Sequence, residues 1–320
     1  MKQKILLIIC LLVFLFIACE VTVRIYQKIA KGTPFFNSVW NYYDKELGWK
    51  GKKVFGDIMT KKYKIFFVGD SFTEGCGVSE SNMYYNIIAK NLDAEAFVYG
   101  GPGYGTLQEY MVINRYIDKI KPDLIVLQVC VNDFINNSWE LESVSFINNN
   151  LLIRPYLVKG KIEYKFPRFP GKLGMILYSY SRLMYLLEYN FDRFLVELCK
   201  RGYLHTVEDD IEHKGIEFDN FKKAVNVTND LVKMIKRRAG WVPIVAFSVS
   251  NYRNYPEQFR NIFQNNNIEF IEDVPNRISE AKLMGADVYL KNQSHWNSAG
   301  HLICGELLSE RLRPRIIKEN

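Results

Sequence analysis

Four short segments of the sequence carry groups that could activate a serine and stabilise an oxyanion. The four groups belong to Ser71, Gly103, Asn132 and His295. A nucleophilic serine needs a neighbouring base to take its proton, and the oxyanion formed when it attacks a carbonyl needs hydrogen-bond donors. The imidazole is a candidate base, and a backbone N–H and a side-chain amide are candidate donors. These residue types therefore predict nucleophilic acyl chemistry, provided that the fold brings the four segments together.

Three of the four segments directly follow predicted strands. The predicted strands are short apolar runs at 65–68, 94–99 and 123–129. Ser71 follows the first, Gly103 the second and Asn132 the third. In open parallel sheets, ligands bind beyond the carboxyl ends of the strands. The three groups are therefore expected at one edge of a sheet.

Strands and helices alternate along most of the chain. The other predicted strands are 242–247 and 268–271, and the predicted helices are 80–92, 107–120, 220–238, 256–265 and 298–311. This alternation predicts an α/β fold with a parallel sheet covered on both faces. The alternation breaks at 138–217, where 151–158 and 162–166 resemble a hairpin and 173–199 is an aromatic-rich helical stretch. This insertion is expected either to cap the site or to pack as an appendage, and a role at the membrane surface is the weaker third alternative.

The four segments resemble, in their order, the motif blocks of the SGNH (GDSL) hydrolases, a family of serine esterases and acyltransferases. The resemblance covers about 64–312 and implies a flavodoxin-like three-layer sandwich, here with an inserted hairpin and helical segment. It implies that Ser71 is the nucleophile and His295 the base. It also implies that Gly103 and Asn132 lend an amide N–H and a side-chain amide to the oxyanion hole. A side chain at Gly103 would obstruct the approach of substrate to that N–H.

The sequence departs from the family at the acid of the triad. The family has aspartate two or three positions before the histidine, where this chain has Asn292 and Gln293. An anion stabilises the imidazolium, whereas a neutral amide only orients the ring. Three interpretations stay open: a dyad whose base is oriented by Asn292, Gln293 or a backbone carbonyl; an acid from elsewhere, Asp287 and Asp273 being nearest in sequence; or a degenerate enzyme.

The sequence does not match the common nucleotide-binding and zinc-binding motifs. The glycine-rich run at 100–105 does not fit Gly-x-Gly-x-x-Gly because Thr106 occupies the last glycine position, and no phosphate loop is present. The six cysteines do not have zinc-site spacing. The resemblance implies no metal and no organic cofactor. The net charge is +7, of which the first 31 residues contribute five cations and one anion, and no dense basic run argues for nucleic-acid binding.

The beginning of the chain predicts membrane attachment. Lys2 and Lys4 precede an apolar run from Ile5 to Cys19, which is followed by Glu20. We expect an uncleaved signal anchor at 1–24, a connector at 25–62 and a catalytic domain at 63–320 outside the cytoplasm. A lipoprotein modified at Cys19 is the second choice, and cleaved secretion the third.

The expected function is that of a membrane-anchored esterase or O-acyltransferase. Its substrate is expected to be an acylated carbohydrate of the cell envelope or another small ester, since location and family resemblance both favour acyl groups on envelope glycans. The oligomeric state is left open. The competing interpretation is a catalytically degenerate binding or assembly protein that keeps the fold and its pocket.

Overall fold

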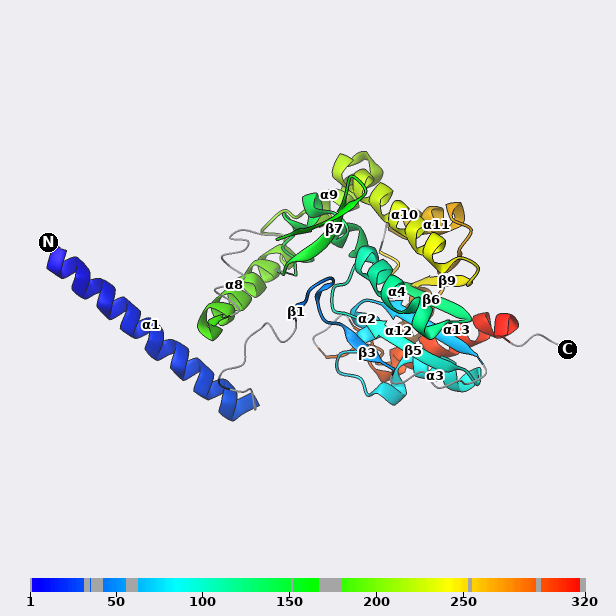
Figure 1. Ribbon diagram of the computed structural model, residues 1–320, viewed down its shortest axis with the longest axis horizontal. Coiled ribbons are helices and arrows are strands. Elements are labelled where there is room, and N and C mark those ends of the chain that lie inside the picture. The colour runs from blue at the N-terminus through cyan, green and yellow to red at the C-terminus, as the bar shows by residue number, and fades with distance from the viewer. Residues whose placement is uncertain are drawn as a thin grey trace.

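A six-stranded sheet forms the centre of the protein (Figure 1). The structure is a computed structural model, and it describes residues 2–31, 35, 43–55, 63–150, 152–166, 180–252, 255–291 and 295–316. The strands of the sheet are β3 (Lys52–Val54), β4 (Lys64–Gly69), β5 (Glu95–Gly100), β6 (Leu124–Val129), β9 (Ile244–Ser248) and β10 (Glu269–Ile271). The order is β10-β9-β6-β4-β5-β3, with five parallel strands and β3 antiparallel at one edge. In chain order the parallel strands are arranged 2-1-3-4-5, the flavodoxin-like arrangement. The predicted fold class is confirmed.

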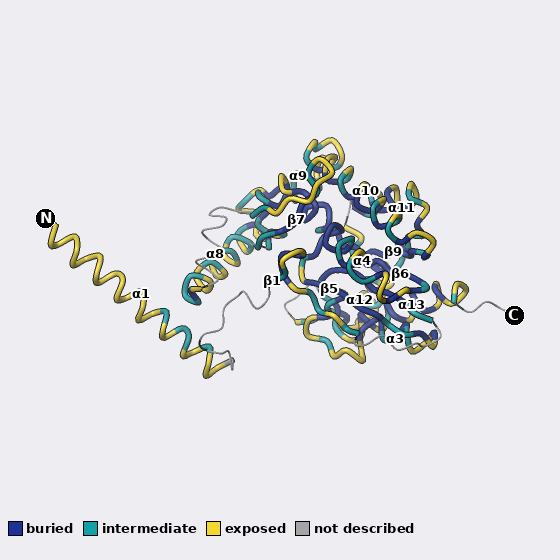
Figure 2. The backbone as a smooth tube through the Cα atoms, viewed as in Figure 1, coloured by how far each residue is buried: buried dark blue, intermediate teal, exposed yellow. Residues whose placement is uncertain are grey.

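Helices cover both faces of this sheet. One face packs against α4 (Thr106–Ile120), α10 (Asp219–Ala239) and α11 (Tyr255–Asn265), and the other against α3 (Tyr84–Asn91), α12 (Val274–Leu283) and α13 (Ser298–Ile316). Alternate strand residues divide between the two cores: Phe66 and Val68 enter the first, and Ile65 and Phe67 the second. All four are fully buried, and each side chain of this size contributes roughly 1.5–3 kcal/mol on burial. Figure 2 shows this buried centre in dark blue.

The longer helices form where apolar residues recur every three or four positions. In α10 the buried side chains are Phe221, Ala224, Thr228, Leu231, Val232, Ile235 and Ala239. This spacing places them on one stripe facing the sheet. The helix ends at Gly240, whose φ of 61° lies in the left-handed region that glycine adopts readily. Two elements that the prediction did not include are α12 and β3.

Short elements surround the carboxyl edge of the sheet. They are α2 (Ser71–Glu74), the 3-10 turn η2 (Glu80–Asn82) and α5 (Asp133–Asn136). The insertion contributes α6 (Trp139–Glu142), the hairpin β7 (Arg154–Val158) and β8 (Lys161–Lys165), α8 (Arg182–Lys200), α9 (Val207–Lys214) and η3 (Gly215–Glu217). Of the helical stretch predicted at 173–199, positions 173–179 lie outside the described residues.

The N-terminal region differs from the expected boundaries. Helix α1 (Lys2–Lys31) continues past position 24, and its segment Lys2–Ala30 is long and apolar enough to cross a membrane. The expected connector at 25–62 also contains the small hairpin β1 (Tyr43–Asp44) and β2 (Gly48–Trp49), and β3, which pairs with β5 in the main sheet. Backbone pairing therefore assigns β3 to the α/β domain, although its sequence carries no strong strand signal.

Candidate active site

Ser71 lies at the first turn after β4, at the carboxyl edge of the sheet. It begins α2, and the Asp70 carboxylate caps this helix by accepting a hydrogen bond from the Phe72 N–H at 2.9 Å. The Gln128 Oε1 accepts hydrogen bonds from the Asp70 N–H at 3.0 Å and from the Thr73 hydroxyl at 2.9 Å. The turn that contains Ser71 is thus held by the buried side chain of Gln128 on β6, the strand beside β4 in the sheet.

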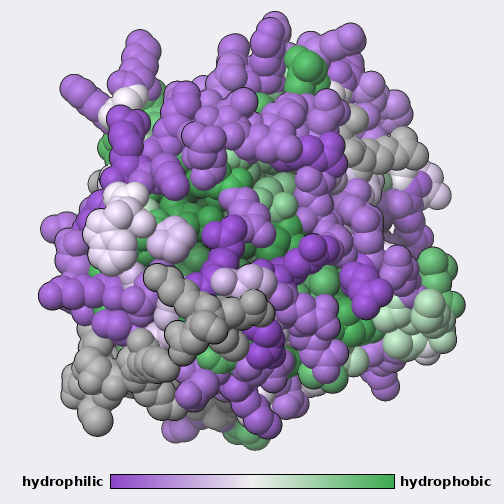
Figure 3. Space-filling view, turned by 90° about the vertical axis from the view of Figure 1, so that its right-hand side faces the viewer, coloured by the Kyte–Doolittle hydropathy of each residue, from purple (hydrophilic) through white to green (hydrophobic). Residues whose placement is uncertain are grey.

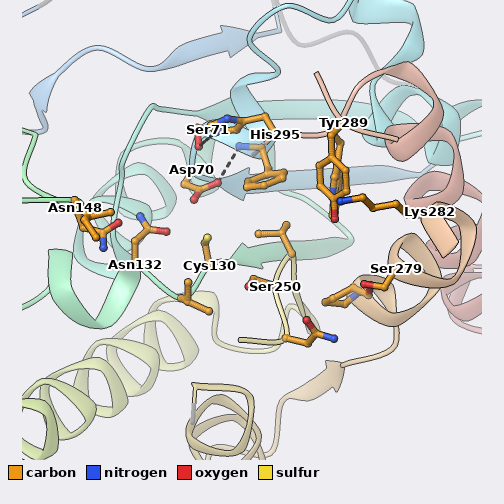
Figure 4. A pocket seen from close by; sticks show the side chains of 17 residues that line it. Asp70, Ser71, Cys130, Asn132, Asn148, Ser250, Ser279, Lys282, Tyr289 and His295 are labelled. Carbon is orange, nitrogen blue, oxygen red and sulfur yellow. Dashed lines mark hydrogen bonds between the residues drawn. The ribbon is translucent and has the colours of Figure 1, made fainter. Parts of the chain in front are cut away.

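His295 meets Ser71 although 224 positions separate them. The Nε2 atom of His295 lies 2.7 Å from the Oγ atom of Ser71 (Figure 4). His295 lies in the loop after α12. The His295 carbonyl accepts a hydrogen bond from the Leu290 N–H at 2.9 Å, and the centre of the His295 ring lies 4.8 Å from that of the Phe72 ring. Burial lowers the pKa of His295 below its usual value. Burial therefore favours the neutral imidazole, the form that can accept a proton.

Asn132 lies in the same pocket, directly after β6. Its Nδ2 atom donates to the Asn136 Oδ1 at 2.8 Å, and the Asn136 amide donates to the Asn148 carbonyl at 2.8 Å. An amide nitrogen has two N–H groups, so this bond fixes the side chain and uses one of them. In Figure 4, Asn132 and Asn148 lie on one flank of the pocket. Part of the predicted insertion therefore orients the predicted oxyanion donor.

Gly103 is half-buried in the loop after β5, and it is not among the described residues that line the pocket. Its φ is 64°, and a Cβ atom there would lie 2.5 Å from side-chain atoms of Asn150. The structure thus shows two constraints that sequence reasoning did not include: the left-handed backbone and the insertion packed against it.

A buried cation from the insertion holds this glycine loop. The Arg154 guanidinium is 1% exposed and donates to the Gly103 carbonyl at 2.7 Å and to the Gln108 Oε1 at 2.6 Å. It forms an ion pair with Glu142 at 2.8 Å and lies 4.6 Å from the Trp49 ring. Sequence reasoning missed Arg154, because nothing in the local pattern around it indicates a distant glycine loop.

The partner of the second ring nitrogen of His295 is not among the described residues. Asn292 and Gln293, the predicted orienting residues, lie outside them. Asp273 pairs with Arg311, and Asp287 is exposed. Within the described ranges no carboxylate is bonded to the His295 ring, and the pKa of His295 is lowered by burial alone. The geometry thus gives no support to Asp273 or Asp287 as a replacement acid.

Buried carboxyl groups lie beneath the site. Burial raises the pKa of Asp70 to about 6. Burial, and then the nearby Asp133, raise the pKa of Glu109, and burial together with Asp70 raises that of Asp133. Both Glu109 carboxylate oxygens lack a hydrogen-bond partner among the described residues. No group of three metal-ligating side chains occurs in the described part of the chain.

The pocket has a volume of about 690 Å³, and both polar and apolar side chains line it. Figure 4 shows Tyr289, Lys282 and Ser279 on the flank opposite Asn132. The Lys282 ammonium lies 5.2 Å from the Tyr289 ring centre, and the Ser279 hydroxyl donates to the Pro275 carbonyl at 2.8 Å. The sequence analysis missed this wall, because α12 was not predicted.

Comparison with known proteins agrees with this geometry. Residues 65–157 match the family model for the GDSL-like lipase/acylhydrolases. No curated protein matched the sequence.

Three solved structures show distant likeness. A G-D-S-L family lipolytic protein from Veillonella parvula is 11% identical, with 78% of this chain and 97% of that chain covered and a TM-score of 0.44. The acetyl xylan esterase Est2A from Butyrivibrio proteoclasticus is 14% identical, with 81% and 66% covered and a TM-score of 0.40. A lipase/acylhydrolase from Enterococcus faecalis is 12% identical, with 81% and 99% covered and a TM-score of 0.44. At these scores, the likenesses carry no information on substrate.

The family match begins at β4 and includes the Gly-Asp-Ser turn, the glycine loop and the Asn132 segment. The flavodoxin-like sheet and the contact between Ser71 and His295 agree with it. Residues 65–157 therefore carry a GDSL-like lipase/acylhydrolase domain, which supports an SGNH-type hydrolase.

Proposed function

We propose that the protein is a serine esterase or O-acyltransferase that works through an acyl group on Ser71. The observation that carries the proposal is the 2.7 Å separation of the His295 Nε2 and Ser71 Oγ atoms. At this distance the neutral imidazole can take the hydroxyl proton as the oxygen attacks an ester carbonyl.

Each proton and bond in this reaction has a defined destination. The Ser71 oxygen bonds to the carbonyl carbon, and His295 receives the proton. Collapse of the tetrahedral intermediate breaks the ester C–O bond, and the imidazolium returns the proton to the departing alcohol. Water, or the hydroxyl of an acceptor, then gives its proton to His295 and attacks the acyl carbon. Collapse of this second intermediate breaks the bond between the acyl carbon and the Ser71 oxygen, which receives the proton back from the imidazolium.

Three donors are proposed for the oxyanion: the N–H groups of Ser71 and Gly103 and the Asn132 side-chain amide. Support comes from the hydrogen bond that orients Asn132 and from the contacts on both sides of Gly103. The Trp49 indole N–H donates at 2.9 Å to the Pro102 carbonyl, which shares a peptide unit with the Gly103 N–H, and Arg154 holds the next peptide through the Gly103 carbonyl. Donors held in place before reaction stabilise the developing charge without a reorganisation cost. The pair Ser71–His295 is proposed to work as a dyad, with the ring held by Asn292, Gln293 or a backbone carbonyl.

The proposed substrate class is ester-linked acyl groups, acetyl groups above all, on carbohydrate of the cell envelope. Its support is the group of polar side chains from Ser250, Asn251 and Lys282 in the pocket, which suits a hydroxylated molecule. Helix α1 supports a membrane-anchored domain outside the cytoplasm. Whether acyl groups pass to water or to a sugar hydroxyl depends on the acceptor that reaches Ser71.

The test compares two serines of the same pocket in the full-length protein. Ser71→Ala is expected to abolish labelling by a fluorophosphonate and to lower turnover of a short acetyl ester by several orders of magnitude. Ser279→Ala is the matched control, because this hydroxyl lines the pocket and bonds within its own helix. Equal turnover by wild type and Ser71→Ala would refute the proposal. Absence of labelling in the wild type would favour a degenerate binding protein.

A further inference from the structure

Helix α8 exposes an apolar stripe along its length. Leu187, Phe191 and Phe194 follow one another at spacings of four and three, which places them on one side of a helix. Their side chains are 54%, 60% and 57% exposed. The charged residues of the helix lie at other angles: Arg182, Glu188, Asp192, Arg193, Glu197 and Lys200. A two-sided helix with its apolar side uncovered is expected to meet a partner.

The first turn of α8 is fixed to α1. The Glu20 carboxylate accepts hydrogen bonds from the Ser181 hydroxyl at 2.9 Å and from the N–H groups of Arg182 and Leu183 at 2.9 and 2.8 Å. Arg24 pairs with Glu20 at 2.6 Å and donates to the Tyr180 carbonyl at 2.6 Å. The carboxylate thus satisfies N–H groups that a helix start leaves without partners.

The position of this contact along α1 sets the depth of α8. Glu20 is the first charged residue after the apolar run that begins at Ile5. Charged residues at the end of such a run lie in the headgroup region rather than the hydrocarbon. If α1 crosses the membrane, α8 therefore begins at the level of the membrane surface. Figure 1 shows α8 running across the direction of α1 rather than along it, which is the orientation of a helix lying on that surface.

We propose that α8 lies in the membrane interface, with Leu187, Phe191 and Phe194 inserted at the boundary between headgroups and acyl chains. The partner is lipid: the most exposed leucine and aromatic side chains of α8 lie on one face and its charged residues on the others, as in interfacial helices. This inference rests on the proposed membrane location of α1. The helix then joins the catalytic domain to the membrane through its insertion, in addition to the chain connection from α1.

The face seen in Figure 3 provides a contrast. It is the right-hand side of Figure 1, away from α1 and α8, and hydrophilic side chains surround its hydrophobic hollow. In Figure 2 the backbone of α8 is instead coloured mostly yellow and teal, which marks exposed and intermediate residues.

The test measures the depth of fluorescent labels in the full-length protein reconstituted into phosphatidylethanolamine and phosphatidylglycerol vesicles. The exposed native cysteines are first replaced by serine: Cys10, Cys19 and Cys76. An environment-sensitive label is then placed by Phe191→Cys on the stripe or by Arg193→Cys, about 200° around the helix. A third variant, Phe14→Cys, reports on α1. Retained labelling of Ser71 by a fluorophosphonate shows that each variant is folded.

The label at position 191 is expected to shift its emission to the blue and to be quenched most by lipids with a nitroxide near the headgroup. The label at 193 is expected to remain accessible to aqueous iodide. Quenching at 14 without quenching at 191 would overturn the inference and leave the anchor intact. No lipid quenching at either position would refute the anchor as well. A label at 191 that is shielded from iodide but not quenched by lipid would assign the stripe to a protein partner and overturn the inference.

Discussion

At the scale of single residues, burial sets the protonation of His295, the proposed base. His295 is half-buried, and the lowered pKa of its ring keeps the imidazole neutral near neutral pH without a carboxylate among the described residues beside it. A neutral ring can act as a base, but no anion stabilises the imidazolium that forms. The proposed dyad therefore gains a base that works at lower pH and loses some stabilisation of the charged intermediate.

The pH dependence of ester hydrolysis follows from the lowered pKa of His295. The rate requires the neutral imidazole, so kcat/KM is expected to fall as the pH drops through this pKa, with a midpoint below 6.5. The measurement is a profile of kcat/KM against pH with a short acetyl ester. A midpoint above 6.5 would indicate an anion at the ring and would contradict the dyad.

At the scale of elements, the insertion does more than follow the Asn132 segment in the chain. Strand β7 supplies Arg154, which is bonded to the Gly103 carbonyl, and the preceding loop supplies the Asn148 carbonyl that orients Asn136. Two of the three proposed oxyanion donors, the Asn132 amide and the Gly103 N–H, thus lie in segments that residues from 138–217 contact. This supports a positioning role for the insertion beside the expected capping or packing role.

Removing the Arg154 charge tests this role. Arg154→Met leaves the fully buried Glu142 carboxylate without its cation and is expected to lower the free energy of unfolding by about 3–5 kcal/mol. The double variant Arg154→Met/Glu142→Gln removes both charges and is expected to recover part of the stability, while kcat for ester hydrolysis stays low and KM changes little.

Chemical denaturation and steady-state kinetics measure the two effects. Arg260→Met is the control, because its ion pair with Glu272 lies at the surface, where solvent screens it. Recovery of wild-type kcat in the double variant would show that Arg154 only stabilises the fold.

At the scale of the whole molecule, the sheet concentrates buried acids at the edge that carries the site. Asp70, Glu109 and Asp133 are all buried there, and all three have raised pKa values. A carboxyl group whose pKa is raised on folding stabilises the fold in its protonated form. That contribution is present below the unfolded pKa and is lost as the pH rises through the folded pKa.

The contribution of Asp70 can be isolated by substitution. Its pKa rises from 3.8 to about 6, so its stabilising contribution is expected to be lost between about pH 4 and 7, by about 3 kcal/mol. Asp70→Asn keeps a capping side chain and is expected to flatten this part of the stability profile. Urea denaturation of both proteins across this pH range measures the difference. Parallel profiles would show that Asp70 does not carry this pH dependence.

The sequence by itself determined the elements whose signals are local. The apolar runs predicted the five parallel strands, the three-and-four spacing predicted α4, α10 and α11, and the Gly-Asp-Ser turn and His295 were identified as candidate chemistry. Strand β3 and helix α12 were missed, because a three-residue edge strand is defined by its pairing partner and α12 has only a short apolar pattern.

Only the tertiary structure decided which distant groups meet. The contact of Ser71 with His295 depends on where two loops end in space, and so do the Arg154 bond to Gly103 and the Glu20 cap on α8. A hydrogen bond between residues far apart in sequence leaves no periodic pattern in either segment. Local sequence encodes which backbone conformation each segment adopts, whereas the packing of the sheet and its insertion fixes the distances on which the chemistry depends.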